Sequence, residues 1–282
     1  MELTQDQYEQ IIDQAIAEDL DKGDCTTDSL ISETERGTAS IRTKANGILA
    51  GAEIARQVFL RIDSELKIDI FIKDGTAIKP GDAIARVEGK VSSILKAERT
   101  ALNFLQHLSG IATETARYVE AVKGLPTKIV DTRKTIPGLR AMEKYAVLMG
   151  GGKNHRMHLG DGILIKDNHL KVLRRQGLRV KEIIAKARAQ NTTGLKIEVE
   201  AKSPEEALEA ADARADIVML DNMSLSDMRK AVGLIKGRCL IEASGGVKLE
   251  RVRAIAETGV DIISVGALTH SPKALDINMK LD

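Results

Sequence analysis

The chain has 282 residues, which is long for one minimal domain and short for three, so one large and one smaller domain are expected. Its net charge is +1, and its only aromatic residues are three Tyr and three Phe. This composition excludes a broad basic surface for nucleic acid or anionic membrane, and a stacking platform for single strands. Cys25 and Cys239 are too few for a disulfide framework or a cysteine-based zinc site.

The first twenty residues contain several acids and lack the apolar core of a secretory signal. No stretch approaches the ~18–20 apolar residues that span a bilayer. We therefore expect a soluble, cytoplasmic protein without nucleic-acid or membrane partners.

In chain order, the first hundred or so residues mix helix and strand. Apolar residues at helical spacing predict a helix over 4–20 with Thr4 as its cap. Alternation at Ala39, Ile41 and Thr43 predicts a strand within 36–50. Further expected elements are a helix over 53–62, a strand over 67–72, a turn at 79–82 between two β segments, and a helical pattern over 92–123 with Gly110 as a break.

After Lys123 the pattern changes to short apolar runs that alternate with helical stretches such as 204–213 and 249–258. The runs are 128–130, 163–165, 195–199, 217–220, 239–241 and 262–265. Strand and helix in alternation predict βα units around a parallel sheet or barrel. Six or seven strands are fewer than the eight of a complete barrel, so we expect an open one.

Enzymes with such folds place their chemistry at the carboxyl ends of the strands. Polar or small residues follow the runs at Asp131, Lys166, Glu200, Asp221, Ser244 and Gly266. These positions are therefore the first candidates for a functional site.

Cationic motifs lie close to three of these positions. Arg133 and Lys134 follow Thr132, His155 and Arg156 follow the glycines at 150–152, and Lys166 is followed by His169. Arginine forks and lysine point charges suit carboxylates and phosphates. Three alternatives stay open: a solvated basic turn for Arg133 and Lys134, a flexible turn at the glycines, and a Schiff-base lysine at Lys166.

Glu200 and Asp221 end consecutive predicted strands and offer the hard oxygen ligands of Mg²⁺. Pairing of either carboxylate with a nearby cation is the alternative. Glycine-bearing loops follow the last two strands, at Ser244, Gly245 and Gly246 and at Gly266. Such loops bind phosphate through backbone N–H groups. Together the motifs predict a pocket for a sugar phosphate that carries pyrophosphate, beside a small dicarboxylate, but the residues alone do not name the reaction.

In this order the motifs resemble those of quinolinate phosphoribosyltransferases, also called carboxylating nicotinate-nucleotide pyrophosphorylases. The matching segments cover nearly the whole chain: 18–19, 23–24, 26–27, 97–103, 131–135, 154–156, 165–169, 198–200, 220–222, 242–246 and 265–266. The resemblance implies an α/β protein with an N-terminal α/β sandwich domain over 1–110, which the C-terminal segment 270–282 could join, and an open, incomplete β/α barrel over 111–269. It also implies a homodimer whose active sites are completed by the partner.

The resemblance further implies a role for each motif. Quinolinate would meet Arg99 of the other subunit together with Thr132, Arg133, His155, Arg156, Lys166 and His169. Lys134 would face the pyrophosphate, Glu200 and Asp221 would hold Mg²⁺ and the ribose hydroxyls, and Ser244, Gly245, Gly246 and Gly266 would hold the 5′-phosphate. Lys134, Lys166, Glu200 and Asp221 are the expected catalytic residues. Glu200 is preferred to Glu198 because it follows the predicted strand and has the family's spacing to Asp221.

The implied reaction transfers phosphoribosyl from phosphoribosyl pyrophosphate to quinolinate with decarboxylation. A molybdenum-transport-associated binding protein of the same fold is a rival, which the intact Arg99 and Lys166–His169 motifs disfavour. Nicotinate phosphoribosyltransferase is another, although its substrate has no second carboxylate for so many cations. An aldolase with Lys166 as Schiff base is the third.

Overall fold

The computed structural model describes residues 3–235 and 237–282, and Met1, Glu2 and Lys236 lie outside the described residues. The chain forms two compact units, each built from separate stretches of sequence. The first unit comprises Met1–Ala116, Thr135–Gly152 and Leu268–Asp282, and the second comprises Arg117–Lys134 and Lys153–Ala267.

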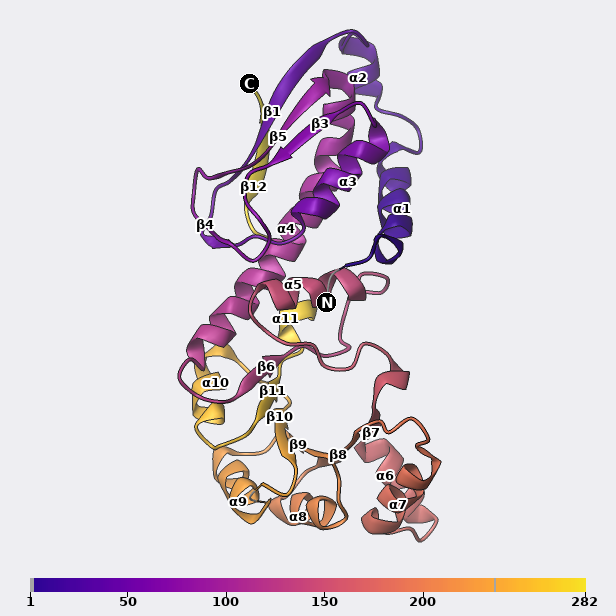
Figure 1. The fold of residues 1–282 in the computed structure, drawn as a ribbon, viewed down its shortest axis with the longest axis vertical. Helices are drawn as coiled ribbons and strands as arrows, with labels where there is room; N and C mark the ends of the chain where they lie inside the picture. Colours follow the sequence, from indigo (N-terminus) through magenta and orange to yellow (C-terminus); the bar gives the residue numbers. More distant parts are fainter. Residues whose placement is uncertain (1–2, 236) are drawn as a thin grey trace. The chain divides into compact units, whose positions relative to one another are not determined.

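The first unit contains an antiparallel sheet of order β12-β1-β5-β3 (Figure 1). Its strands are β1 (Arg36–Thr43), β3 (Lys67–Ile70), β5 (Ala83–Lys90) and β12 (Ile277–Leu281), beside a small ladder of β2 (Gly47–Ile48) and β4 (Ala77–Ile78). The predicted alternation is confirmed, because Ala39, Ile41 and Thr43 are all buried. The last strand of the chain pairs with the first, with Ile41 opposite Met279.

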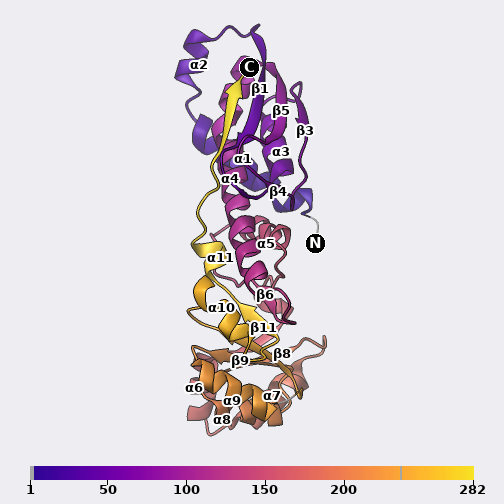
Figure 2. The ribbon, with the colours of Figure 1, turned by 90° about the vertical axis from the view of Figure 1, so that its left-hand side faces the viewer.

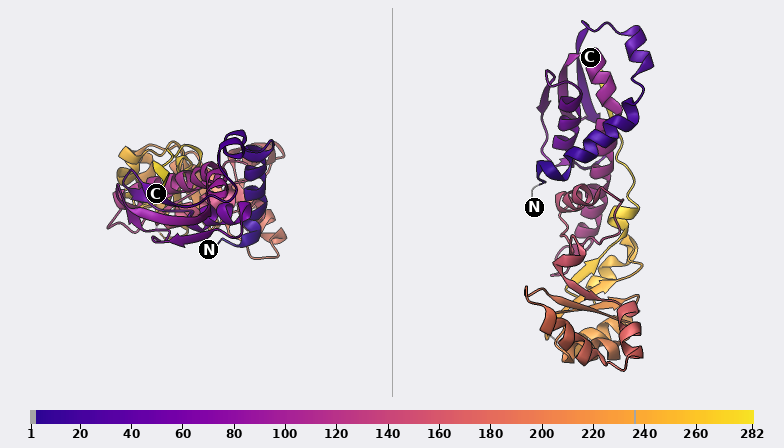
Figure 3. Two further views of the ribbon diagram at one scale, coloured as in Figure 1. Left: turned by 90° about the horizontal axis from the view of Figure 1, so that it is seen from above. Right: turned by 90° about the vertical axis from the view of Figure 1, so that its right-hand side faces the viewer.

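Helices of the first unit are η1 (Gln5–Gln7), α1 (Glu9–Leu20), α2 (Cys25–Leu30), α3 (Ala52–Ile62) and α5 (Arg140–Met149), with most of α4 (Val91–Ala121) and α11 (Ala267–His270). Phe59 of α3, Leu105 of α4 and Ile84 of β5 meet around one small cavity, so α3 and α4 cover one sheet face. Arg61 of α3 pairs with Asp13 of α1 at 2.5 Å, and Figure 3 shows the two helices side by side.

Two helix predictions need correction. Thr4 caps the short 3-10 turn η1 and the α-helix begins only at Glu9. Gly110 is not a break, since α4 runs unbroken from Val91 to Ala121. A Cβ at Gly110 would lie 2.2 Å from the carbonyl oxygen of Lys273, so this glycine allows the C-terminal segment to approach the helix.

The second unit is built around a parallel sheet of six strands in the order β6-β11-β10-β9-β8-β7. The strands are β6 (Lys128–Val130), β7 (Ile163–Ile165), β8 (Ile197–Ala201), β9 (Ile217–Asp221), β10 (Leu240–Ser244) and β11 (Ile262–Ser264). The intervening elements are η2 (Leu159–Asp161), α6 (Asp167–Arg175), α7 (Val180–Gln190), α8 (Pro204–Asp212), α9 (Leu225–Ile235) and α10 (Leu249–Ala256). In this sheet β6 and β7 are edge strands that do not pair with each other, which confirms the open parallel arrangement.

Helices cover one face of the parallel sheet, and Figure 2 shows α7, α8 and α9 together beside β8 and β9. The residues beneath them alternate along each strand and are fully buried, as Val199, Val218 and Ala243 illustrate. The residues that alternate with these along each strand therefore point to the opposite face of the sheet. None of the described helices has the length and hydropathy needed to cross a membrane.

Two strands run two or more residues beyond their predicted carboxyl ends. β8 covers Ile197–Ala201 and β10 covers Leu240–Ser244, so Glu200 and Glu242 lie inside strands. The carboxylates of these two residues interrupt the apolar pattern by which the strand ends were predicted.

Candidate active site

The inner face of the parallel sheet carries polar side chains in two layers. Residues two apart on a strand share a face, so Glu198 and Glu200 both project inward from β8. The register sets Ser244 beside Asp221 at the carboxyl ends of β10 and β9. Glu200 and these two residues form the outer layer, and Glu198 with Glu242 forms the deeper one.

In the outer layer, two carboxylates oppose each other electrostatically. Burial and the negative charge of Asp221 raise the pKa of Glu200 above its usual range. Asp221 Oδ1 accepts a hydrogen bond from Asn222 Nδ2 at 2.9 Å. A pair of hard oxygen donors with unfavourable mutual charge fits a divalent cation such as Mg²⁺.

Beside this pair lies the glycine loop that follows β10. Gly245 has φ of +91°, and a Cβ there would lie 2.4 Å from the Asn222 side chain. Asn222 itself has φ of +54° and donates its backbone N–H to Ser244 O at 2.9 Å. Ser264 Oγ donates to Ser244 Oγ at 2.9 Å and ties the neighbouring strand end to the loop. Only glycine fits this close approach of two strand ends.

The deeper layer is centred on the imidazole of His155. Its Nε2 lies 3.2 Å from Glu198 Oε2 and 3.4 Å from Glu242 Oε2, and both carboxylates are buried. Burial opposes the charged form of His155, but the two carboxylates outweigh it and raise its pKa to about 10. Burial is also the main cause that raises the pKa of Glu198.

Asp131 fixes the segment that carries this histidine. It is fully buried, its Oδ1 accepts from His155 N at 2.9 Å, and its Oδ2 accepts from Asn154 Nδ2 at 2.5 Å. The backbone N–H of Asp131 donates to Lys153 O at 3.1 Å. Asp131 thus acts on the site through the loop 153–155, which it holds against the end of β6.

Two guanidinium groups gather next to the deeper layer. Burial, and then the positive charge of Arg133, lower the pKa of Arg156, while Glu198 acts in the opposite direction. Arg156 Nη1 donates to Gly162 O at 2.8 Å. Among the described residues, Arg133 Nε is a buried donor without a hydrogen-bond partner. Two neighbouring cations with an unused donor favour a ligand bearing carboxylates or phosphate.

The predicted lysines are more exposed than the arginines. Lys134 and Lys166 are both exposed, Lys134 just after β6 and Lys166 just before α6. Lys166 N donates to His169 Nδ1 at 3.0 Å, and Lys134 N donates to Thr132 Oγ1 at 3.0 Å. Schiff-base lysines are activated by burial, so the exposure of Lys166 does not favour the aldolase alternative.

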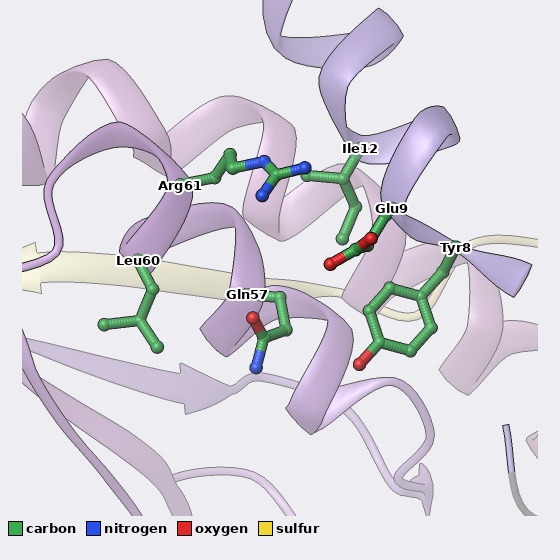
Figure 4. A pocket seen from close by; sticks show the side chains of 6 residues that line it. All are labelled: Tyr8, Glu9, Ile12, Gln57, Leu60 and Arg61. Carbon is green, nitrogen blue, oxygen red and sulfur yellow. The ribbon is translucent and has the colours of Figure 1, made fainter. Parts of the chain in front are cut away.

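A cavity of about 210 Å³ reaches the deeper layer. His155, Arg156, Glu198 and Glu242 line its polar side, and apolar residues such as Leu164 line the rest. The first unit has a smaller cavity of about 80 Å³ between α1 and α3, lined by Tyr8, Glu9, Ile12, Gln57, Leu60 and Arg61 (Figure 4). It has only one cation, Arg61, already paired with Asp13, so it does not match an anion site.

The second unit thus holds every predicted site residue except Arg99, which is exposed on α4 in the first unit. The sequence favoured Glu200 over Glu198. It did not predict a role for Glu242, or for Asp131 as the support of His155. The alternation Glu198–Val199–Glu200 was the available signal, because it requires both acids to share one face. The pairing of Glu242 with His155 had no sequence signal.

Fold and site together define a parallel α/β protein whose sheet carries a pair of carboxylates at its strand ends and a group of cations nearby. Comparison with known proteins makes this specific. Residues 24–109 match the family model "Quinolinate phosphoribosyl transferase, N-terminal domain", and residues 111–280 match the corresponding C-terminal domain model.

Similar full-length proteins agree. A Bacillus subtilis protein named probable nicotinate-nucleotide pyrophosphorylase [carboxylating] is 41% identical, over 97% of this chain and 93% of that protein. A tobacco quinolinate phosphoribosyltransferase, named as mitochondrial, is 41% identical over 95% of this chain and 80% of its own length. The crystal structure of NadC from Streptococcus pyogenes has a TM-score of 0.95 at 42% identity, covering 100% of this chain and 99% of that one. The chain belongs to the quinolinate phosphoribosyltransferase family.

Proposed function

We propose that this protein transfers the phosphoribosyl group of phosphoribosyl pyrophosphate to quinolinate and releases pyrophosphate and CO₂. It is a carboxylating nicotinate-nucleotide diphosphorylase that forms nicotinate mononucleotide in NAD biosynthesis. The observation that supports this best is that one sheet carries an acidic pair and a glycine loop at its strand ends, with two guanidiniums next to its deeper layer.

The chemistry divides into two steps. The pyridine nitrogen of quinolinate attacks the anomeric carbon with its lone pair as the bond to pyrophosphate breaks, and the ring nitrogen becomes cationic. The bond to the adjacent carboxylate then breaks, CO₂ leaves, and its electron pair remains on the ring carbon until a proton replaces it. Lys166 and His155 are the candidates for that proton donor.

The residues assist by placing charge. Arg133, Arg156 and Lys166 would bind the two carboxylates, and Lys134 would stabilise the charge that develops on pyrophosphate. Thr132, His155 and His169 complete the quinolinate pocket, and the loops at Ser244–Gly246 and Gly266 receive the 5′-phosphate.

Glu200 and Asp221 would hold Mg²⁺ and the ribose hydroxyls. Two carboxylates whose charges oppose each other fit such an ion, as the raised pKa of Glu200 indicates. Bound there, Mg²⁺ would neutralise the negative charge of the pyrophosphate leaving group.

We further propose a homodimer in which Arg99 of one subunit reaches the quinolinate of the other, and a functional division of the chain near residues 110 and 269. A cytoplasmic location remains a prediction, and the tobacco relative carries a mitochondrial name.

The acidic pair is tested with alanine variants of Glu200 and Asp221, singly and together. If both act on one bound Mg²⁺, the double variant should lose little more activity than the worse single variant. The measurement is kcat/KM for phosphoribosyl pyrophosphate at several Mg²⁺ concentrations. Losses that multiply as independent factors would show that the two carboxylates do not share an ion.

A further inference from the structure

A further role for the deeper layer, Glu198 and Glu242, follows from the proposed function. We propose that Glu198 and Glu242 are positioning residues for quinolinate: they hold the His155 ring inside the barrel and, through it, fix Arg156 where a substrate carboxylate binds. Neither acid would touch the substrate.

The first step is geometric. Glu198 comes from β8 and Glu242 from β10, with β9 between them, yet both reach Nε2 of the same imidazole at 3.2 and 3.4 Å. The opposite ring nitrogen, Nδ1, accepts the backbone N–H of Arg156 at 2.9 Å. Because Nδ1 accepts a hydrogen bond, a ring proton must lie on Nε2, between the two carboxylates. The orientation of the ring thus links the acid pair to the backbone of Arg156.

The second step concerns the carboxylate oxygens. Among the described residues, both oxygens of Glu242 and Oε1 of Glu198 are buried without a hydrogen-bond partner, and Glu242 is 0% exposed. Buried acids of this kind weaken folding unless something compensates them, and neutral side chains would often serve stability as well. Their presence therefore indicates a task other than stability.

The third step identifies that task. Arg133 and Arg156 repel each other, whereas Glu198 attracts Arg156. The buried negative charge allows two guanidiniums to remain together before a dicarboxylate arrives. Three interactions hold Arg156. Its backbone N–H donates to His155 Nδ1, its Nη1 donates to Gly162 O, and the negative charge of Glu198 attracts its guanidinium. A guanidinium that is already held in place before the substrate arrives lowers the entropic cost of binding.

The same atoms could coordinate a transition metal, since His155, Glu198 and Glu242 present ligand atoms within 4.8 Å of one another. Both carboxylates already lie within ion-pair distance of Nε2, so the N–H of the ring occupies the place that an ion would otherwise take. The geometry favours the proton.

The test uses Glu198→Gln and Glu242→Gln, which keep shape and remove charge, in the full-length protein. We expect the KM and Kd for quinolinate to rise about ten-fold or more, as for loss of one charge-assisted contact. The KM for phosphoribosyl pyrophosphate should stay within about two-fold. Glu198→Asp should recover part of the quinolinate affinity. Glu209→Gln, on the exposed surface of α8, is the matched control and should change neither constant.

His155→Gln should raise the quinolinate KM similarly, and adding Glu198→Gln should produce little further change. The assignment is overturned if the folded variants keep wild-type affinity for quinolinate, if neither glutamine variant folds, or if Zn²⁺ binds stoichiometrically to the wild type but not to Glu242→Gln. A wild-type protein that forms no nicotinate mononucleotide would instead refute the proposed function itself.

Discussion

At the scale of single residues, charged side chains carry the proposed chemistry, and no thiol takes part as a nucleophile. Cys239 is half-buried, and burial raises the pKa of its thiol to about 11. A raised thiol pKa means that the reactive thiolate is scarce until the pH approaches that value, so about one molecule in a thousand carries it at pH 8.

We therefore predict that a thiol reagent such as iodoacetamide modifies Cys239 slowly at pH 8 and faster as pH rises toward 11. Mass spectrometry of the modified peptides gives both rates, with the exposed Cys25 as internal comparison. Cys239→Ala should retain full activity. Fast labelling of Cys239 at pH 8, or an inactive alanine variant, would contradict this.

The strand-end positions of single residues could be predicted from the sequence, whereas contacts between distant strands could not. Strand ends pointed to Asp221 and Ser244, because polar residues after an apolar run are visible in one dimension. The convergence of Glu198 and Glu242 on His155 was invisible, because it depends on a register between strands that are not adjacent in the sheet. Buried acids also look like the ends of strands in a hydrophobicity pattern.

At the scale of elements, helix α4 shows how tertiary packing overrides a local signal. Gly110 lowers helix propensity by about 1 kcal/mol relative to alanine, which is why it looked like a break. The helix nevertheless continues, and the close approach of the Lys273 backbone explains why a glycine lies there. Sequence cannot reveal this, since the two residues are far apart in the chain.

This yields a paired prediction. Gly110→Ala should destabilise the protein by about 1–3 kcal/mol, because its Cβ would meet a backbone carbonyl that no rotamer change can move. Gly233→Ala in α9 meets nothing within 4 Å and should stabilise by up to about 1 kcal/mol. Urea unfolding of both variants provides the measurement. Equal effects of the two substitutions would show that helix propensity, and not packing, decides both.

At the scale of the whole molecule, the two units interleave along the chain. The first unit takes back Thr135–Gly152 and Leu268–Asp282 after the chain has entered the second. The alternation of strands and helices predicted the parallel sheet of the second unit, because each strand and the helix that follows it are close together in the sequence. The return of the two later segments to the first unit has no local sequence pattern, so it could not be predicted from periodicity.

Arg99 provides the test at this scale. An ordinary exposed arginine would change stability by less than ~0.5 kcal/mol and leave activity intact. A charge-assisted bond to quinolinate is worth roughly 1.5–3 kcal/mol, so Arg99→Ala should lose about 10- to 150-fold in kcat/KM. The two impaired variants Arg99→Ala and Lys166→Ala are then mixed under conditions in which subunits exchange.

Each mixed dimer would contain one intact site, so random exchange should restore about a quarter of wild-type activity. Exchange is followed separately with a mass-tagged subunit. If subunits exchange and activity does not return, Arg99 does not act on the partner's site.

The most direct test of the central claim is the stoichiometry of the reaction. Purified protein is incubated with Mg²⁺, phosphoribosyl pyrophosphate and quinolinate labelled in the carboxylate next to the ring nitrogen, and released CO₂ and pyrophosphate are counted. We predict equal amounts of both products, formed only when phosphoribosyl pyrophosphate is present, and little or no pyrophosphate when nicotinate replaces quinolinate. Comparable turnover of nicotinate, or pyrophosphate released from quinolinate without CO₂, would contradict it.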